Sequence, residues 1–418
     1  MCEPFRFIHN SGVQSPYEEV RNNPMTTIAT TDVLTERAAE LRAEGEVNER
    51  LGKLSEKSVE IMRQSGVMKL LAPTEYGGTR AHPAEFAEMV MKMASLDGSA
   101  GWVAGVVGVH PWELELMSPK LQEEIWGADD ETWVSSPYAP MGVATPVDGG
   151  YKFTGHWQFS TGTDHADWVI LGAFLADRSG EKIMPPRFLH VVVPRSDYTI
   201  VDDSWDVVGL KGTGSKDVII NDVFVPEYRV VDQTDLFSGK VARDAGKTEP
   251  IHRLPFYSIF PQGLTAAVVG IAEGALQAHL DYQSNRVQIN GFKSVEDPYT
   301  MYAVSEAAGE IRASRVSLLD NINRLYDTVA AGKEISMEQR AVGRRTQIQA
   351  AWRATAAIDT ILARSGGNGL RMNNPIQRFW RDAHMGTAHA IHVPGPSYHA
   401  AVLTEIGLEP PVHLASAV

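Results

Sequence analysis

The sequence contains a single cysteine, Cys2, among its 418 residues. One cysteine excludes an internal disulfide and any metal site built from several thiolates, and such scarcity is typical of the reducing cytoplasm, where we expect the protein to reside. The chain has no apolar run that approaches membrane-spanning length, and no block of Lys or Arg. Because the net charge of -14 repels phosphate backbones and anionic lipids, we expect neither nucleic acid nor a membrane as a partner.

The first residues lack the pattern of a folded segment. Residues 1–24 show neither helical spacing nor the apolar core of a signal peptide, and Met25 follows them. We predict that residues 1–30 form an extension or a disordered arm. An ordered arm on a partner subunit is the alternative.

Hydrophobic residues make up 43% of the whole sequence, enough for a large core. The chain after the extension divides by periodicity into three regions. Apolar residues recur every three or four positions across residues 31–131, which predicts a helical domain. Across residues 132–235 the period changes to two, with Gly, Pro and Asp at the breaks, which predicts a β domain of about seven short strands. Residues 236–418 return to helical spacing in four long segments, each long enough to cross a bundle, which begin near Gly263, Ser305, Ser336 and Pro375.

Three histidines gather near the chain end in "FWRDAHMGTAHAIHVPG", residues 379–395. On a helix His389 and His392 share a face, whereas His384 points elsewhere, and no nearby Cys or Glu completes a set of ligands. The sequence therefore predicts no metal site.

The same helix suggests a ligand site instead. Asp382, Gly386 and His389 lie on one helical stripe, and Gly386 removes a side chain beside His389, so a flat ligand has room to approach. A half-buried histidine can take a proton from a phenol or an alcohol near neutral pH. A core histidine that bonds a backbone carbonyl is the alternative.

Two further stretches combine aromatic and polar residues. In "GHWQFSTGTDHADW" the hydroxyls of Ser160 and Thr161 follow Phe159 at a strand end, a combination that suits a planar polar heterocycle or simply a turn. In "GWVAGVVGVHPW" Trp102 and His110 fall on one helical face, unless His110 only ends the helix. The glycine-rich "GLKGTGSKD" and "RSGGNGL" lack the strand–GxGxxG–helix context, which excludes a Rossmann domain.

These pieces together resemble the acyl-CoA dehydrogenase fold. The resemblance covers nearly everything after residue 31 and is carried by "PTEYGG", "FSTG", "GLKGTGSKDVIINDVFVP" and "SGGNGL…NPIQRFWRDAH". It implies an α+β multidomain protein with an N-terminal α-helical domain, a middle β-barrel or sandwich, and a C-terminal four-helix bundle. It also implies a flavin between the β domain and the bundle, a neighbouring subunit that reaches the cofactor, and hence a homotetramer.

The sequence departs from the straight-chain dehydrogenases at the position of the base. These enzymes carry a glutamate nine residues beyond the arginine of the "RDA" motif, and that count from Arg381 reaches Ala390. A plain histidine such as His389 is too weak a base for an alkyl α-proton. The segments "VVGVHPW", "SSPYAPMG", "FSTGTDHADW" and "PIQRFWRDAHMGTAHA" are instead similar to the two-component flavin-dependent monooxygenases of this fold, above all to the hydroxylases of phenolic secosteroids and of 4-hydroxyphenylacetate.

This resemblance implies the oxygenase component of a two-component flavin-dependent monooxygenase. Such a protein takes reduced flavin, FMNH2 or FADH2, from a separate NAD(P)H-dependent flavin reductase, forms a C4a-hydroperoxyflavin with O2, and hydroxylates a phenol ortho to its OH. A compact phenol, a secosteroid and an indole remain open as substrates. An acyl-CoA dehydrogenase-type flavoenzyme, an oxygenase of indoles or other heteroaromatics, and a non-catalytic assembly protein remain as alternatives.

The resemblance also assigns roles to individual residues. It makes His389 the base or hydrogen-bond partner of the phenol, His110 a second substrate contact, and Thr161 the hydroxyl near flavin N5. Thr161 stands where relatives carry serine, which leaves open whether Thr161 or Ser160 makes that contact. The remaining implied flavin contacts are Trp102 and Phe159 as walls, Ser135 and Ser136 at the pyrimidine edge, Arg253 near the isoalloxazine, Arg286 on a phosphate from another subunit, and the Gly366, Gly367 and Asn368 loop.

Overall fold

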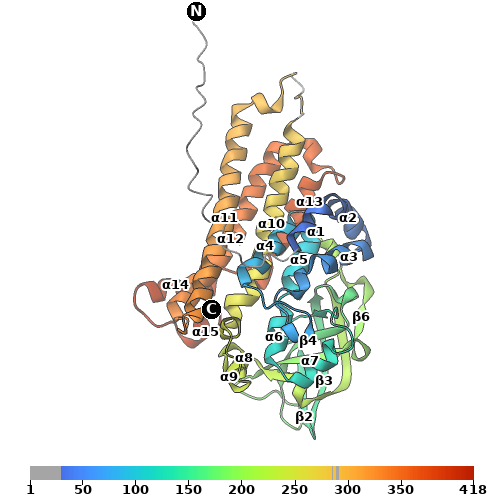
Figure 1. Cartoon of the computed structure of the whole chain (residues 1–418), viewed down its shortest axis with the longest axis vertical. Coiled ribbons are helices and arrows are strands. Elements are labelled where there is room, and N and C mark those ends of the chain that lie inside the picture. Colours follow the sequence, from blue (N-terminus) through green and yellow to red (C-terminus); the bar gives the residue numbers. More distant parts are fainter. Residues whose placement is uncertain (1–29, 285, 289–290) are drawn as a thin grey trace, which may run out of the picture.

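The computed structural model describes residues 30–284, 286–288 and 291–418. Residues 1–29 of the predicted extension lie outside these described residues. The described elements run in the order helix, strand, helix, and they confirm the expected α+β class with the acyl-CoA dehydrogenase-like arrangement (Figure 1). The helices before the first strand are α1 (Thr30–Glu36), α2 (Ala38–Leu51), α3 (Glu56–Ser65), α4 (Pro83–Ala94), α5 (Gly98–Val107), α6 (His110–Leu116) and α7 (Pro119–Trp126).

The strands form one eight-stranded sheet among the described residues, one strand more than the sequence predicts. The order is β6-β7-β3-β2-β4-β5-β8, and the short β1 pairs in parallel with β4. Phe153, Trp157, Val218 and Ile220 alternate toward the sheet's buried core, as the period of two requires. The strands are β1 (Val134–Ser135), β2 (Gly142–Val147), β3 (Gly150–Ser160), β4 (Trp168–Leu175), β5 (Phe188–Pro194), β6 (Thr199–Val201), β7 (Lys216–Pro226) and β8 (Val230–Asp232).

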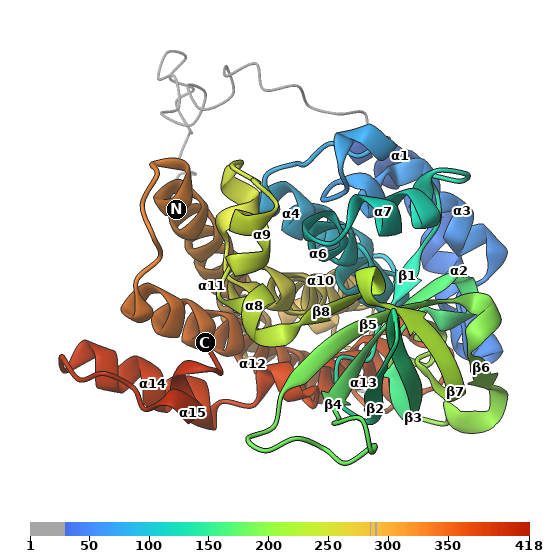
Figure 2. The same ribbon diagram turned by 90° about the horizontal axis from the view of Figure 1, so that it is seen from below.

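The helices after the sheet include a bundle of α10 to α13, whose long helices run side by side in Figure 1. The first two long helices begin seven residues before the predicted starts, so α10 contains Pro261. Figure 2 shows α14 and α15 on the side of α12 away from the sheet. These helices are α8 (Gln233–Phe237), α9 (Lys240–Asp244), α10 (Phe256–Ser284), α11 (Pro298–Ala330), α12 (Met337–Ser365), α13 (Pro375–Thr387), α14 (Gly395–Glu405) and α15 (Val412–Ala415).

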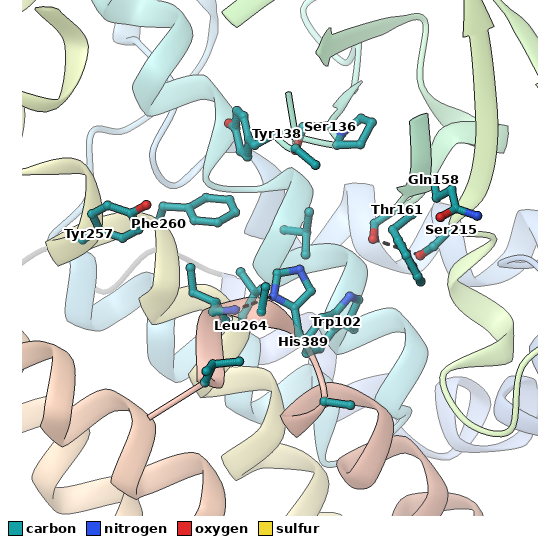
Figure 3. A pocket seen from close by; sticks show the side chains of 18 of the residues that line it. Trp102, Ser136, Tyr138, Gln158, Thr161, Ser215, Tyr257, Phe260, Leu264 and His389 are labelled. Atoms are coloured by element: carbon teal, nitrogen blue, oxygen red, sulfur yellow. Dashed lines mark hydrogen bonds between the residues drawn. The ribbon is translucent and has the colours of Figure 1, made fainter. Parts of the chain in front are cut away.

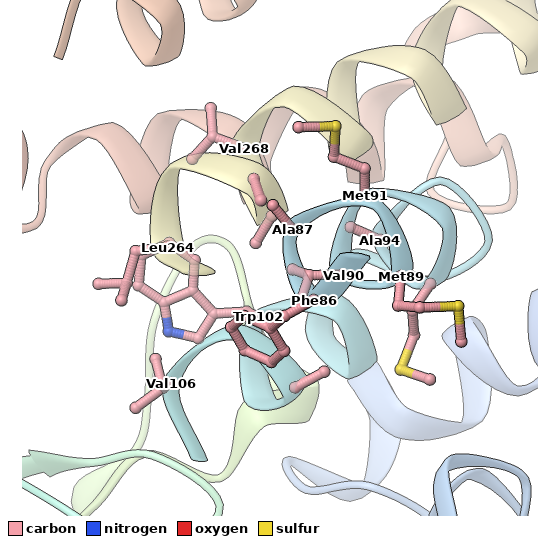
Figure 4. Packing of buried hydrophobic residues seen from close by; sticks show 14 of the residues in the cluster. Phe86, Ala87, Met89, Val90, Met91, Ala94, Trp102, Val106, Leu264 and Val268 are labelled. Atoms are coloured by element: carbon pink, nitrogen blue, oxygen red, sulfur yellow. The ribbon is translucent and has the colours of Figure 1, made fainter. Parts of the chain in front are cut away.

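Helix α10 is the centre of the largest core. Its buried side chains pack against α4 and α5, and Figure 4 shows Phe86, Trp102 and Leu264 within the same apolar cluster. The backbones of α5 and α10 approach closely, since a Cβ added to Gly105 would lie 2.5 Å from the carbonyl oxygen of Gly263. This crossing brings the C-terminal half of α5 against the N-terminal third of α10.

By length and composition α10 is apolar enough to cross a membrane, which corrects the prediction that no run approaches that length. Of the apolar window in this helix, 89% is buried inside the protein. Burial on all sides is typical of the core helix of a bundle, and this explains an apolar composition without a membrane.

Candidate active site

A cavity of about 810 Å³ lies where the end of β3, helix α5, the start of α10 and the segment after α13 meet. Its walls are largely aromatic and aliphatic. In Figure 3 the labelled Thr161, Gln158 and Ser215 lie on one side, and Tyr257 and Phe260 on the opposite side, with His389 between them. The cavity therefore joins the β domain to the bundle, where a large planar ligand and a second ring have room together.

The β side of the cavity carries a chain of hydroxyl groups. Thr161 Oγ1 and Ser215 Oγ lie 2.9 Å apart, Ser215 Oγ is 2.8 Å from Thr213 Oγ1, and Thr213 donates to the carbonyl oxygen of Leu210. The ring of Phe159 remains 55% exposed, because its φ of +66° at the irregular end of β3 turns the side chain outward. This wall offers both hydrogen-bonding groups and an open aromatic face.

The loop that carries Leu210 is held by helix α13. Arg381 Nη1 donates to the carbonyl oxygen of Val208 at 2.6 Å, and the backbone N–H of Leu210 donates to Asp382 Oδ1 at 2.6 Å. A Cβ at Gly209 would lie 2.1 Å from the carbonyl oxygen of Arg381, so this approach requires glycine. The "RDA" motif thus fixes one wall of the cavity, and burial raises the pKa of Asp382 to about 7.

His389 lies beyond the helix on which the sequence places it. Helix α13 ends at Thr387, and His389 precedes a short 3₁₀ turn, Ala390–His392. Its Nδ1 accepts from the backbone N–H of Ile391 at 3.1 Å, a local bond that competes with continuation of the helix. The predicted stripe of Asp382, Gly386 and His389 is therefore wrong.

The space at Gly386 is not open to a ligand. A Cβ there would lie 2.9 Å from Val268 Cγ2 and 3.0 Å from Trp102 Cζ3, so the indole fills the place that we predicted for a flat ligand. The indole in turn contacts His389 edge-on, with ring centroids 5.8 Å apart. The ligand space lies on the other side of this pair, within the cavity.

The bond from Ile391 fixes the protonation of His389. Burial lowers the pKa of His389 to about 4, so the ring is neutral near pH 7. Since Nδ1 accepts a proton donor, the single ring proton of the neutral form resides on Nε2. His389 is therefore a hydrogen-bond donor in this arrangement.

His110 has the opposite tautomer. Its Nδ1 lies 2.5 Å from the carbonyl oxygen of Val134, which can only accept, and its Nε2 lies 2.8 Å from Ser136 Oγ. Burial lowers the pKa of His110 to about 4. The neutral ring donates through Nδ1, and its Nε2 accepts the Ser136 hydroxyl proton, so Ser136 Oγ keeps the capacity to accept a hydrogen bond in the cavity that it lines.

A buried polar network supports this corner. The Tyr138 hydroxyl donates to Glu113 Oε2 at 2.6 Å, and Glu113 Oε1 lies 2.6 Å from His190 Nδ1. Burial raises the pKa of Glu113, but His190 and the Tyr138 hydroxyl outweigh this effect and the net shift is downward. Glu113 is thus a carboxylate near His110, and its charge favours a proton on that ring.

The sequence-predicted residues separate into two groups. Five of them line the cavity, namely Trp102, Ser136, Phe159, Thr161 and His389, and His110 contacts it through Ser136. Ser135 and Ser160 are fully buried and do not line it. Their hydroxyls bond each other at 3.2 Å, which corrects their prediction as ligand contacts.

Arg253, Arg286 and the glycine loop lie outside the cavity of their own chain. Arg253 donates to the carbonyl oxygens of Val329 and Gly332 at the end of α11, so it serves there as a helix cap, not as a charge beside the cavity. Arg286 donates to the carbonyl oxygen of Ser365 at 3.1 Å. It thereby adjoins the loop of Gly366, Gly367 and Asn368 at the far ends of α10 and α12.

Several residues that line the cavity are not predicted from the sequence as site residues. Tyr138 and Ser215 lie in stretches that carry the family resemblance, but that resemblance gives neither residue a role. Arg344 lies in an Ala-rich segment that is typical of helix packing. Tyr257 and Phe260 come from "PFYSIFPQ", whose aromatic residues read equally well as core. Only the tertiary structure brings these residues to one cavity.

No group of three or more potential metal ligands occurs within the described residues. His384 lies 3.4 Å from Asp359, and His392 bonds Thr265 and the carbonyl oxygen of Gly386, so neither ring joins His389. For His392 the core interpretation is correct. Among the described residues that line the cavity there is also no carboxylate, the group that a thioester dehydrogenase requires as its base.

Comparisons with known proteins agree with the fold. The family "Acyl-CoA dehydrogenase, C-terminal domain" matches residues 262–394. The chain is 53% identical to a pigment production hydroxylase of Rhodococcus erythropolis, over 89% of this chain and 95% of that protein. It is 39% identical to the flavin-dependent monooxygenase oxygenase subunit HsaA of Mycobacterium tuberculosis, over 92% of this chain and 99% of that protein. The crystal structure of a 3-HSA hydroxylase from Rhodococcus sp. RHA1 superimposes with a TM-score of 0.87 at 36% identity, over 93% of this chain and all of the other.

The chain belongs to the flavin-dependent monooxygenases that share the acyl-CoA dehydrogenase fold. Within this family it is the oxygenase component of a two-component aromatic hydroxylase, which uses reduced flavin and O2.

The residues of the cavity fit a flavin. The isoalloxazine ring has a polar edge of nitrogen and carbonyl oxygen atoms and two apolar faces. The hydroxyl groups of Thr161 and Ser215 match the polar edge, while Trp102 and Phe159 supply apolar surface. When bound, reduced flavin supplies the electrons that activate O2 for transfer to the aromatic ring.

Proposed function

We propose that the protein hydroxylates a phenol at the carbon ortho to its hydroxyl group, with reduced FMN or FAD delivered by a separate NAD(P)H-dependent reductase. The observation that carries this proposal is a pair of neutral histidines with opposite tautomers, His389 at the cavity and His110 behind Ser136. Ser136 with His110 presents an acceptor, and His389 presents a donor, to the same space (Figure 3). A phenol hydroxyl is both donor and acceptor, and it matches the two.

The two histidines then have different tasks. As the ring carbon ortho to the phenol hydroxyl takes one oxygen atom of O2, the other atom would leave as water with the two electrons that reduced flavin supplies. The phenol O–H bond would break in the same step, its proton would pass to Ser136 Oγ, and the Ser136 proton would move to His110 Nε2. The Glu113 carboxylate stabilises the resulting imidazolium, and His389 Nε2–H donates to the phenolate oxygen. Because His110 is a weak base at rest, the proton moves only when attack has made the phenol more acidic. The apolar walls keep water from the reacting atoms.

Stopped-flow absorbance tests this function. Protein with anaerobically reduced FMN or FAD is mixed with oxygenated buffer that contains a phenol. We expect a long-lived absorbance band that differs from the spectra of both reduced and oxidised flavin, followed by a catechol product. Immediate oxidation of the flavin with stoichiometric peroxide, as in free solution, would contradict the proposal.

The Ser136→Ala variant isolates the proton acceptor. It should still oxidise flavin at the wild-type rate, while the yield of catechol falls by about 10²- to 10⁴-fold, the usual contribution of a positioned proton acceptor. Ser317→Ala, on α11 remote from the cavity, serves as the control and should keep the wild-type yield. If Ser136→Ala keeps a wild-type yield, the Ser136–His110 relay is wrong.

We also propose a homotetramer in the cytoplasm. Support comes from the resemblance and from the position of Arg286 and the glycine loop, which cannot serve the cavity of their own chain. Next to this loop, Leu370 and Met372 expose 60% and 63% of their surfaces, which suits cover by another copy. Sedimentation velocity should give the mass of four chains; a monomer at micromolar concentration would contradict this proposal.

A further inference from the structure

The cavity contains one charged side chain among its described lining residues, and that charge has no counter-ion. Arg344 lies on α12, lines the cavity and is only 4% exposed. Its Nη1 donates to Gln347 Oε1 at 2.5 Å and its Nη2 to the carbonyl oxygen of Ile391 at 2.6 Å, and both acceptors are neutral. Its buried Nε has no hydrogen-bond partner within the described part of the chain.

Other arginines of the same region are neutralised. Arg345, the next residue of α12, forms a two-pronged pair with Glu405 at 2.7 and 2.9 Å. Arg381 pairs with Glu49 at 2.8 Å. Burial of a cation without an opposite charge is unfavourable, and here burial lowers the pKa of Arg344 to about 10. An anionic group on a ligand in the cavity would offset the unfavourable free energy of this buried charge, so the site favours an anionic ligand.

Arg344 marks the end of the cavity that is remote from the flavin wall. Its guanidinium carbon lies 5.7 Å from the ring centroid of Tyr257. In Figure 3 Tyr257 lies across the cavity from Thr161 and Ser215, with His389 between them. The Tyr257 hydroxyl has no hydrogen-bond partner among the described residues, which leaves it available to a ligand.

We propose that the substrate is a phenol with a carboxylate at the end remote from its hydroxyl group, and that Arg344 binds this carboxylate with help from the Tyr257 hydroxyl. This inference rests on the proposed function, because the phenol end must lie between Ser136 and His389. Charge-assisted hydrogen bonds to a carboxylate are the strongest that a guanidinium makes, and they offset the burial of both charges. Arg344 is thus a determinant of substrate specificity.

The test compares three phenols of one scaffold that differ only at the remote end, as a carboxylate, its primary amide or a methyl group. Their dissociation constants are measured by anaerobic calorimetry on the protein with reduced flavin. We expect the wild type to bind the carboxylate roughly 10- to 100-fold more tightly than the amide, the usual range for hydrogen bonds to a charged group. Equal affinity for the carboxylate and the methyl compound would overturn the proposal without any variant.

Variants separate binding of the anion from a purely structural role in holding Ile391. Arg344→Met should abolish the preference for the carboxylate and leave affinity for the methyl phenol unchanged, and Arg344→Lys should restore part of the preference. Arg345→Met is the matched control and should keep the wild-type preference. Equal weakening of all three phenols in Arg344→Met would overturn the proposal in favour of a structural role. The proposed function fails separately, if none of the three phenols is hydroxylated.

Discussion

Backbone groups set the chemistry of individual residues at this site. An N–H group faces Nδ1 of His389 and a carbonyl oxygen faces Nδ1 of His110, so two neutral imidazoles present opposite atoms to one cavity. The sequence identifies both histidines, and its resemblance to the flavin-dependent monooxygenases implies a phenol as their ligand. It does not reveal the tautomers, because these depend on the turn after α13 and on the edge of β1, which are tertiary features.

The donor role of His389 is tested by two substitutions of this residue. Glutamine keeps an N–H donor of similar reach, so His389→Gln should retain hydroxylation within about tenfold of the wild type. His389→Ala should lose hydroxylation by about 10²- to 10³-fold, the usual effect of removing one donor to a developing oxyanion. Single-turnover product yield is the measurement. If His389 acts as the base, both variants fall together, because neither side chain can accept the proton.

Helices and strands position the site through close backbone approaches. Gly105 and Gly263 let α5 and α10 touch, and Gly209 lets the Leu210 loop lie on α13. Periodicity predicts the long helices, because each buries one apolar face, and the strand that ends in Ser160, because apolar and polar side chains alternate along it. It misplaces the start of α10, because this helix continues through Pro261, and the end of α13, because a local side-chain bond ends that helix early.

Substitution of Gly105 tests the crossing of α5 and α10. A Cβ there would lie 2.5 Å from the carbonyl oxygen of Gly263, so Gly105→Ala should lower the free energy of unfolding by about 1–3 kcal/mol. Gly309→Ala on α11 is the matched control, because its Cβ would have nothing within 4 Å, and better helix propensity should raise stability by up to about 1 kcal/mol. Urea unfolding measures both. Equal stability of the two variants would show that the two helices do not rely on this contact.

In the whole molecule, helix α13 connects the bundle to the β domain through Arg381 and Asp382. The order of domains and the place of the cavity between them follow from sequence by resemblance, since motifs from all three regions meet there. The remote end of the cavity does not, because Arg344, Tyr257 and Phe260 look like ordinary packing residues until α12 and α10 are placed together.

The connection at Asp382 makes stability depend on pH. Burial raises its pKa from 3.8 to about 7, so between these values the folded chain holds a proton that the unfolded chain has released. The free energy of unfolding therefore falls as pH rises through this window, by up to about 4 kcal/mol for this group. Asp382→Asn should remove that part of the decline. Urea unfolding from pH 4 to pH 8 measures it, and parallel profiles for the variant and the wild type would disprove the assignment.

The proposed function requires that one oxygen atom of O2 is transferred to a phenol. The most direct measurement is a single turnover with anaerobically reduced flavin, a phenol and oxygen-18 gas, followed by mass spectrometry of the organic product. We predict a catechol that carries one oxygen-18 atom, and a large loss of this product in Ser136→Ala. Unlabelled phenol recovered intact, with all of the label in peroxide and water, would contradict it.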